Sequence, residues 1–306
     1  MPHASAQPSA GRGLSRAFFI PDGPAFAATE LTRGPWDPGS QHAGPPAALL
    51  ARAIERCEPR EAAQLARVTI EILRPVPIAS LTATASIRRP GRSVELLEGS
   101  LTLASDGTEL MRATAWRLRT TELELPPPPA EPPDPPPPGP ECGESTPFFP
   151  TGAAVGYHTA VDYRFVRGAF LEPGPAMVWM RMRQALVAGE EPTPLQRVMV
   201  AADSGNGVSA ALDWERFVFI NTDLTVHLAR PPAGEWVGLD AVTMPLPSGV
   251  GLTDTALWDE RGRIGRAAQT LLVAPRCDDA RAMRGAHAIT EPPSDVAPDA
   301  GVDRSS

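Results

Sequence analysis

Residues 67–75 read RVTIEILRP and residues 217–231 read FVFINTDLTVHLARP. Both runs alternate apolar with polar residues and are rich in β-branched side chains, which is typical of strands, and both end at an Arg-Pro pair. Proline cannot donate a ladder hydrogen bond, so each strand is expected to stop there. The two Arg-Pro pairs lie 156 residues apart, which indicates an internal duplication.

The residues around each run repeat one order of helix and strands. A helix is expected from Pro45 to Arg56, because proline suits a first helical turn and apolar residues follow at helical spacing. A second helix is expected from Pro194, with Thr193 as its N-cap. Four strands are expected after each helix, at 67–74, 80–88, 94–104 and 110–119 in the first half and at 217–230, 236–243, 250–258 and 265–273 in the second. This pattern favours two similar units, each a helix wrapped by an antiparallel sheet.

A proline-rich stretch separates the two halves. Residues 126–140 read PPPPAEPPDPPPPGP. Such a stretch has almost no backbone donors and stays extended, so we interpret it as a stiff spacer rather than as a ligand for proline-recognising modules. The chain then divides into a disordered N-terminus (1–17), a first folded half (18–124), a proline-rich linker (125–146), a second folded half (147–276) and a disordered tail (277–306).

The composition excludes several classes of function. A net charge of −8 gives no general attraction to nucleic acid, and no run of about eighteen apolar residues predicts a membrane span. Cys57, Cys142 and Cys277 lie far apart without metal-ligand spacing, which predicts a reducing, cytoplasmic location and no metal site. Phosphate-binding glycine loops and nucleophile-elbow motifs are also missing from the sequence, and no cofactor is expected.

Three polar residues in the second half interrupt otherwise apolar elements. Asp203 lies where the second helix ends, Asn221 breaks an apolar strand, and Gln269 interrupts the last strand. A buried carboxylate needs a partner, so Asp203 is a candidate site residue. Solvent exposure at a helix end or on a strand face is the competing interpretation for each of the three. Alternation along the strand places Asn221 on the same face as Asp223 and His227.

Five segments, taken in their order along the chain, give it a resemblance to a known family. They are Gln41-His42-Ala43-Gly44, Ala201-Ala202-Asp203-Ser204, Asn221-Thr222-Asp223-Leu224, Arg230-Pro231 and Gly265-Arg266-Ala267-Ala268-Gln269. With the internal repeat, they make the chain from residue 18 to residue 275 resemble the acyl-CoA thioesterases of the double-hotdog type. The resemblance implies an α+β tandem hotdog fold in which each repeat is a long helix wrapped by an antiparallel sheet. It also implies hydrolysis of an acyl-CoA thioester to free acid and CoA.

The resemblance assigns catalytic roles to the three interrupting residues. In that family an aspartate, a threonine or similar polar residue, and a glutamine hold the hydrolytic water. These roles fall on Asp203 as general base and on Asn221 and Gln269, whose amides orient the water. The chain departs from the family pattern at the middle position, where Thr222 beside Asn221 is the alternative match.

The resemblance also implies residues for substrate binding. The N–H of Gly44 at the start of the first helix is the candidate oxyanion donor, His42 stands beside it, and Arg230 is a candidate for the CoA phosphates. In the first repeat the positions matching two of the catalytic residues are Leu65 and Ala115, which implies a single active site.

Other functions remain open at this point. A hotdog enoyl-thioester hydratase or dehydratase would use an Asp-His pair near a helix start, and no such pair occurs there in the second repeat. A non-catalytic acyl-thioester or lipid-binding module would have the same fold, since fold does not fix function. A scaffold protein that docks through its polyproline would make the repeats incidental. The oligomeric state is also open, with homo-oligomers formed through sheet edges as one outcome.

Overall fold

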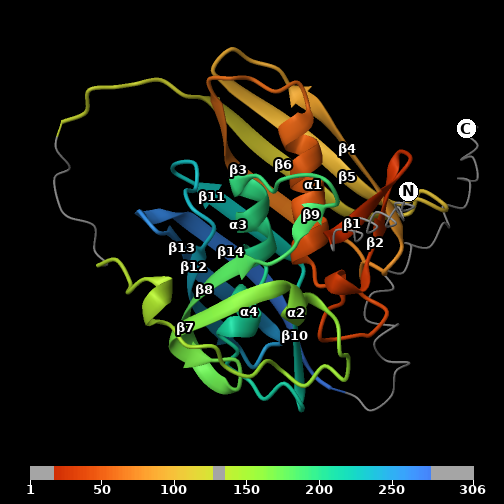
Figure 1. The fold of residues 1–306 in the computed structure, drawn as a ribbon, viewed down its shortest axis with the longest axis vertical. Helices are drawn as coiled ribbons and strands as arrows, with labels where there is room; N and C mark the ends of the chain where they lie inside the picture. Colours follow the sequence, from red (N-terminus) through yellow and green to blue (C-terminus); the bar gives the residue numbers. More distant parts are fainter. Residues whose placement is uncertain (1–16, 127–134, 277–306) are drawn as a thin grey trace, which may run out of the picture. The chain divides into compact units, whose positions relative to one another are not determined.

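A single fourteen-stranded sheet runs through both halves of the chain in the computed structural model, which describes residues 17–126 and 135–276 (Figure 1). The strands of the first half are β1 (Ala17–Asp22), β2 (Ala25–Ala28), β3 (Ala63–Ile72), β4 (Ser80–Arg89), β5 (Val94–Leu103) and β6 (Glu109–Arg119). Those of the second half are β7 (Val161–Ala169), β8 (Glu172–Met182), β9 (Ala185–Val187), β10 (Phe217–Asn221), β11 (Asp223–Leu228), β12 (Val237–Pro245), β13 (Val250–Asp259) and β14 (Gly262–Pro275).

The two halves are joined through the sheet at two places. The order of strands is β7-β8-β12-β13-β14-β11-β3-β6-β5-β4-β2-β1-β9, and β10 pairs with β14. At the centre β11 pairs antiparallel with β3, so that Thr225 lies opposite Thr69. At one edge β9 of the second half pairs in parallel with β1 of the first half. The hydrogen-bonded ladder therefore passes from one half to the other without a break.

The helices are α1 (Gly44–Arg56), α2 (Tyr157–Ala160), α3 (Pro194–Ala202) and α4 (Gly205–Val208), with 3₁₀ turns η1 (Glu30–Thr32) and η2 (Pro140–Cys142). Helix α1 confirms the helix predicted at 45–56, and α3 begins at Pro194 with the predicted Thr193 N-cap. In place of one long second helix, nine residues of α3 are followed by the four residues of α4. Between the two helices the backbone makes hydrogen bonds of the 3₁₀ type. Ser204 N bonds to Ala201 O and Gly207 N bonds to Ser204 O, three residues back in each case.

Helices α1 and α3 pack against each other (Figure 1). Both helices contribute to one continuous hydrophobic core. The buried face of α1 includes Ala47, Ala48 and Ala51, whose short side chains let the helices approach closely. Leu49, Leu50 and Ile54 are fully buried in the same core. Each such side chain contributes about 1.5–3 kcal/mol when removed from water. The packing fixes the start of α1 beside the end of α3.

Strand β10 ends, and β11 begins, on either side of Thr222, where a single strand was predicted at 217–230. Asn221 lies opposite Leu271 of β14, whereas Thr225 lies opposite Ala268, so the register shifts by one residue between them. Such a bulge reverses the faces of the residues that follow it. Odd-numbered β10 residues therefore share a face with buried Leu271, whereas in β11 the even-numbered residues are the buried ones.

The linker is anchored to the second half before the first strand of that half begins. Trp179 Nε1 donates a hydrogen bond to Pro138 O at 2.8 Å, and Glu144 exchanges two backbone hydrogen bonds with Phe165. Linker residues 127–134 and the predicted disordered ends, 1–17 and 277–306, lie outside the described residues, except for Ala17, which begins β1. The division into folded halves at 18–124 and 147–276 stays a prediction.

Candidate active site

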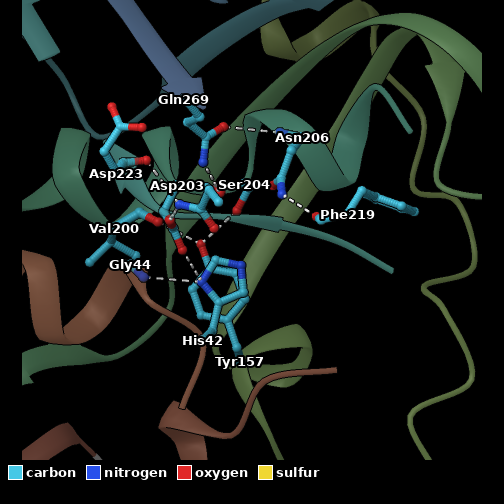
Figure 2. A network of polar contacts seen from close by, with 11 residues as sticks. His42, Gly44, Tyr157, Val200, Asp203, Ser204, Asn206, Phe219, Asp223 and Gln269 are labelled. Carbon is cyan, nitrogen blue, oxygen red and sulfur yellow. Dashed lines mark hydrogen bonds and ion pairs between the residues drawn. The ribbon is translucent and has the colours of Figure 1, made fainter. Parts of the chain in front are cut away.

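A buried carboxylate lies where the two halves of the chain meet. Asp203 is the C-cap of α3 and only 4% exposed. Asn221 Nδ2 donates to its Oδ1 at 2.9 Å. His42 Nδ1 lies 2.9 Å from Asp203 Oδ2 (Figure 2). The interpretation of Asp203 as a solvated helix end is wrong, because the helix ends inside the protein and two polar groups take the place of water.

Asn221 reaches Asp203 because of the bulge at Thr222. The prediction that Asn221 shares a face with Asp223 and His227 is wrong, since simple alternation does not continue through an inserted residue. Asn221 Nδ2 also lies 3.3 Å from the backbone oxygen of Asp223. Thr222, the alternative match, is exposed, and its hydroxyl donates to Thr270 O. Asn221 is thus the residue of this strand that contacts the carboxylate.

Gln269 holds the backbone of the site rather than the carboxylate. Its side chain is 1% exposed, so the interpretation as an exposed strand glutamine is wrong. Its Nε2 donates to Asp203 O at 3.1 Å, and its Oε1 accepts from Asn206 N at 3.2 Å (Figure 2). Gly205 leaves room for this contact, because a Cβ there would lie 2.7 Å from Thr255 Oγ1 and 3.0 Å from Gln269 Oε1.

The first half contributes the start of α1. A Cβ on Gly44 would lie 2.5 Å from Val200 O, so only glycine allows α1 to approach α3 this closely. Pro45 and Pro46 have no N–H, and the Ala47 N–H bonds to Ala43 O. The first turn of the helix therefore presents one amide without a partner inside the helix, that of Gly44, and its N–H donates to His42 Nδ1 at 3.2 Å.

Tyr157 and Ser204 complete the cluster, and the sequence analysis assigned a site role to neither. The Tyr157 ring stacks on the His42 ring with centroids 3.8 Å apart and planes 13° apart. The Tyr157 hydroxyl donates to Val200 O at 2.7 Å and lies 3.0 Å from Ser204 Oγ. Burial raises the pKa of Tyr157, and the nearby Asp203 charge adds to this rise, so the phenol stays neutral. No local motif marks Tyr157, which comes from the short helix α2.

Two family models cover most of the chain. Residues 32–118 match the acyl-CoA thioesterase N-terminal domain, and residues 127–273 match the acyl-CoA thioesterase C-terminal domain. The chain belongs to the acyl-CoA thioesterase family. It is a thioester hydrolase, as the resemblance implied. No protein of curated function matches the thioesterase.

Solved structures show that the thioesterase has the hot dog fold. A putative thioesterase II from Thermobifida fusca YX superposes with a TM-score of 0.66 at 17% identity, covering 86% of this chain and 98% of that chain. A conserved protein of unknown function with hot dog fold from Alicyclobacillus acidocaldarius gives 0.64 at 16% identity, covering 85% and 96%. A putative thioesterase from Novosphingobium aromaticivorans DSM 12444 gives 0.59 at 19% identity, covering 83% and 98%.

Arg230 lies apart from the other predicted residues of the thioesterase. It is nine residues beyond Asn221, roughly 30 Å along an extended chain. Its guanidinium binds both carboxylate oxygens of Asp259, at 2.5 and 2.6 Å. Burial opposes ionisation of Asp259, but the hydrogen bonds from Arg230 and from two backbone amides outweigh it and lower the pKa of Asp259. Arg230 is thus paired with Asp259, and binding of the CoA phosphates by Arg230 stays a prediction.

The opposite ends of the two helices also meet around a carboxylate. Glu55, near the end of α1, accepts hydrogen bonds from Thr193 Oγ1 at 2.9 Å and from Gln196 Nε2 at 3.0 Å at the start of α3. Burial raises the pKa of Glu55.

Leu65 and Ala115, the first-repeat positions matched to the site, carry no polar side chain. Within the described ranges, no helix has both the length and the apolar character needed to cross a membrane.

Proposed function

We propose that the thioesterase hydrolyses acyl-CoA with a water molecule activated by the Asp203 carboxylate. The observation that carries the proposal is the contact of one buried carboxylate with Asn221 on Oδ1 and His42 on Oδ2, beside the amide of Gly44. Each carboxylate oxygen has two lone-pair directions, and each of these contacts uses one. A water molecule bound in a remaining direction would be held against its base.

The reaction balances without a covalent bond between the enzyme and the acyl group. Water attacks the carbonyl carbon of the thioester, and its proton passes to Asp203. The tetrahedral intermediate then collapses, the C–S bond breaks, and the leaving thiolate takes the proton from Asp203 to give CoA, which restores the base. Asn221 fixes the carboxylate, whereas the contacts of Gln269 support a positioning role through the Asp203 backbone rather than direct contact with the water.

The N–H of Gly44 is the proposed oxyanion donor. It lies at the positive end of α1, where the aligned peptide dipoles favour negative charge. A donor fixed in advance at the place where negative charge develops lowers the barrier, because no reorganisation is needed during the reaction. Pro45 and Pro46 have no N–H, so the amide of Gly44 is the donor that this end of the helix offers.

Hydration of an enoyl thioester is a second candidate, and one contact favours it. An Asp-His pair was not expected in the second repeat, but the fold supplies the histidine from the first, with His42 Nδ1 2.9 Å from Asp203 Oδ2. A histidine held by an aspartate can act as a base through its other ring nitrogen. The two reactions differ in product, one giving a free acid and the other a 3-hydroxyacyl thioester.

Product analysis tests these assignments. Purified protein is incubated with short-chain, long-chain and enoyl acyl-CoAs, and with acyl carrier protein thioesters, while free thiol and acyl products are followed. We expect free acid and thiol in equal amounts, and loss of both in Asp203→Asn with acyl-CoA binding retained. A 3-hydroxyacyl product would favour the hydratase, and binding without turnover would favour the non-catalytic module. A cytoplasmic location and self-association stay predictions, and light scattering tests the second.

A further inference from the structure

The Nδ1 atom of His42 has two neighbours that require opposite protonation states of this atom. The N–H of Gly44, 3.2 Å away, is a donor and needs a lone pair on Nδ1. The Oδ2 atom of Asp203, 2.9 Å away, is an acceptor when ionised and needs a proton on Nδ1. One ring nitrogen can carry a proton or a lone pair, but not both. The location of one proton therefore decides which contact is a hydrogen bond.

The surroundings favour the proton on Nδ1. The contact with Asp203 is the shorter one, and a hydrogen bond to a carboxylate is about twice as strong as one between neutral groups. A bare Nδ1 would face the carboxylate with a lone pair, unless Asp203 itself took the proton and ceased to be a base. Two titratable groups contact the imidazole among the described residues, Asp203 and Tyr157, and Tyr157 is a buried neutral phenol.

The position of that proton also determines the state of Gly44. When Nδ1 carries a proton, it no longer accepts the Gly44 N–H, and this amide is released for a substrate oxygen. The ring cannot turn away easily, because it is stacked on Tyr157, whose hydroxyl is tied to Val200 O and Ser204 Oγ on the α3 side of the site (Figure 2). Tyr157 therefore holds the imidazole at a fixed angle to both neighbours.

We propose that His42 is a positioning residue whose Nδ1 proton makes the site competent, by holding Asp203 as an ionised acceptor and by freeing the Gly44 amide for the oxyanion. Tyr157 sets the angle of the ring. The proposal rests on the proposed role of Asp203 as the base. It gives each half of the chain a distinct part, since the second half supplies the base and the first half supplies the group that prepares it.

Two matched variants distinguish the effect of the Nδ1 proton from the effect of the stacked ring. His42→Asn places a side-chain N–H near the position of Nδ1 but lacks the ring, whereas His42→Phe keeps a ring to stack on Tyr157 but lacks the donor. We expect kcat to fall about 100-fold or more in His42→Phe and less than about 10-fold in His42→Asn, with KM within about threefold in both. Equal losses in the two variants, or no loss in His42→Phe, would overturn the proposal. Circular dichroism and thermal melting show that both variants fold.

A spectroscopic measurement reads the proton directly. Full-length protein labelled with ¹⁵N-histidine gives nitrogen shifts that distinguish a protonated from a bare ring nitrogen, and the signals of His42 are those absent from His42→Phe. We expect a protonated Nδ1 that shifts in Asp203→Asn. A bare Nδ1 at the pH of maximal activity would overturn the proposal. If Asp203→Asn keeps full thiol release, the proposed base is wrong, and the nitrogen shift still reports where the proton lies.

Discussion

Replacing Gly44 by alanine tests whether the close approach of α1 and α3 builds the site. The added Cβ would lie 2.5 Å from Val200 O, where ordinary contacts begin at 3.4 Å, so the helices must separate by about 0.9 Å. A misplacement of about 1 Å at a catalytic site costs about 100-fold in rate. Overpacking also lowers the free energy of unfolding by about 1–3 kcal/mol. We therefore expect kcat for thiol release to fall about 100-fold and the urea midpoint to drop.

Gly39→Ala is the matched control, because its Cβ would meet Asp37 Oδ1 at 3.4 Å, an ordinary contact. It should change kcat less than about twofold, because nothing at the site has to move. Alanine has a higher helix propensity than glycine, so propensity alone would stabilise Gly44→Ala. Wild-type activity together with a raised urea midpoint in Gly44→Ala would refute the reasoning, since the variant would then respond to propensity and not to the helix contact.

Three further variants test single contacts. Asn221→Leu removes the donor to Asp203 Oδ1, and kcat should fall about 10- to 100-fold with acyl-CoA binding unchanged; an unchanged kcat would contradict this role. Arg230→Ala leaves buried Asp259 without its guanidinium partner and should cost about 1–3 kcal/mol of unfolding free energy while KM stays constant. A raised KM would instead support a role of Arg230 in substrate binding. The raised pKa of Glu55 means that the folded state holds its proton more tightly than the unfolded state, so this group contributes stability at low pH that is lost as the pH rises above its ordinary value of 4.5. Glu55→Gln should therefore gain stability relative to wild type at pH 7 but not at pH 4 in urea titrations, and an equal difference at both pH values would contradict the assignment.

The elements that the sequence predicted are those with a local signal. Pro45 and the alanine-rich stripe after it marked α1, and Thr193-Pro194 marked the start of α3. Strands β4, β5, β6 and β13 follow the predicted runs to within one or two residues, because alternating apolar residues mark them. The pairing of β9 with β1 depends on long-range contacts between short segments, which leave no periodic pattern.

Three members of the candidate site could be picked out from the sequence, but not its other members or its geometry. Asp203, Asn221 and Gln269 stand out because each interrupts an apolar element, and the structure brings them together. The direction of Asn221 depends on a one-residue bulge, which alternation cannot reveal. Tyr157 reaches the site from a four-residue helix, and its partner His42 comes from the other half of the chain. Contacts of this kind are set by how the halves pack, not by local sequence.

The rate constant for thiol release in a single turnover of Asp203→Asn tests the central claim most directly. Enzyme in excess over an acyl-CoA substrate removes product release from the measurement, and the dissociation constant of the same substrate is determined in parallel. Loss of a general base predicts a rate about 1,000-fold below wild type with the dissociation constant within about threefold. Asp254→Asn, the same change at a half-buried residue paired with Arg266, should leave both unchanged. A single-turnover rate equal to that of wild type would contradict the account, since the water would then have another base.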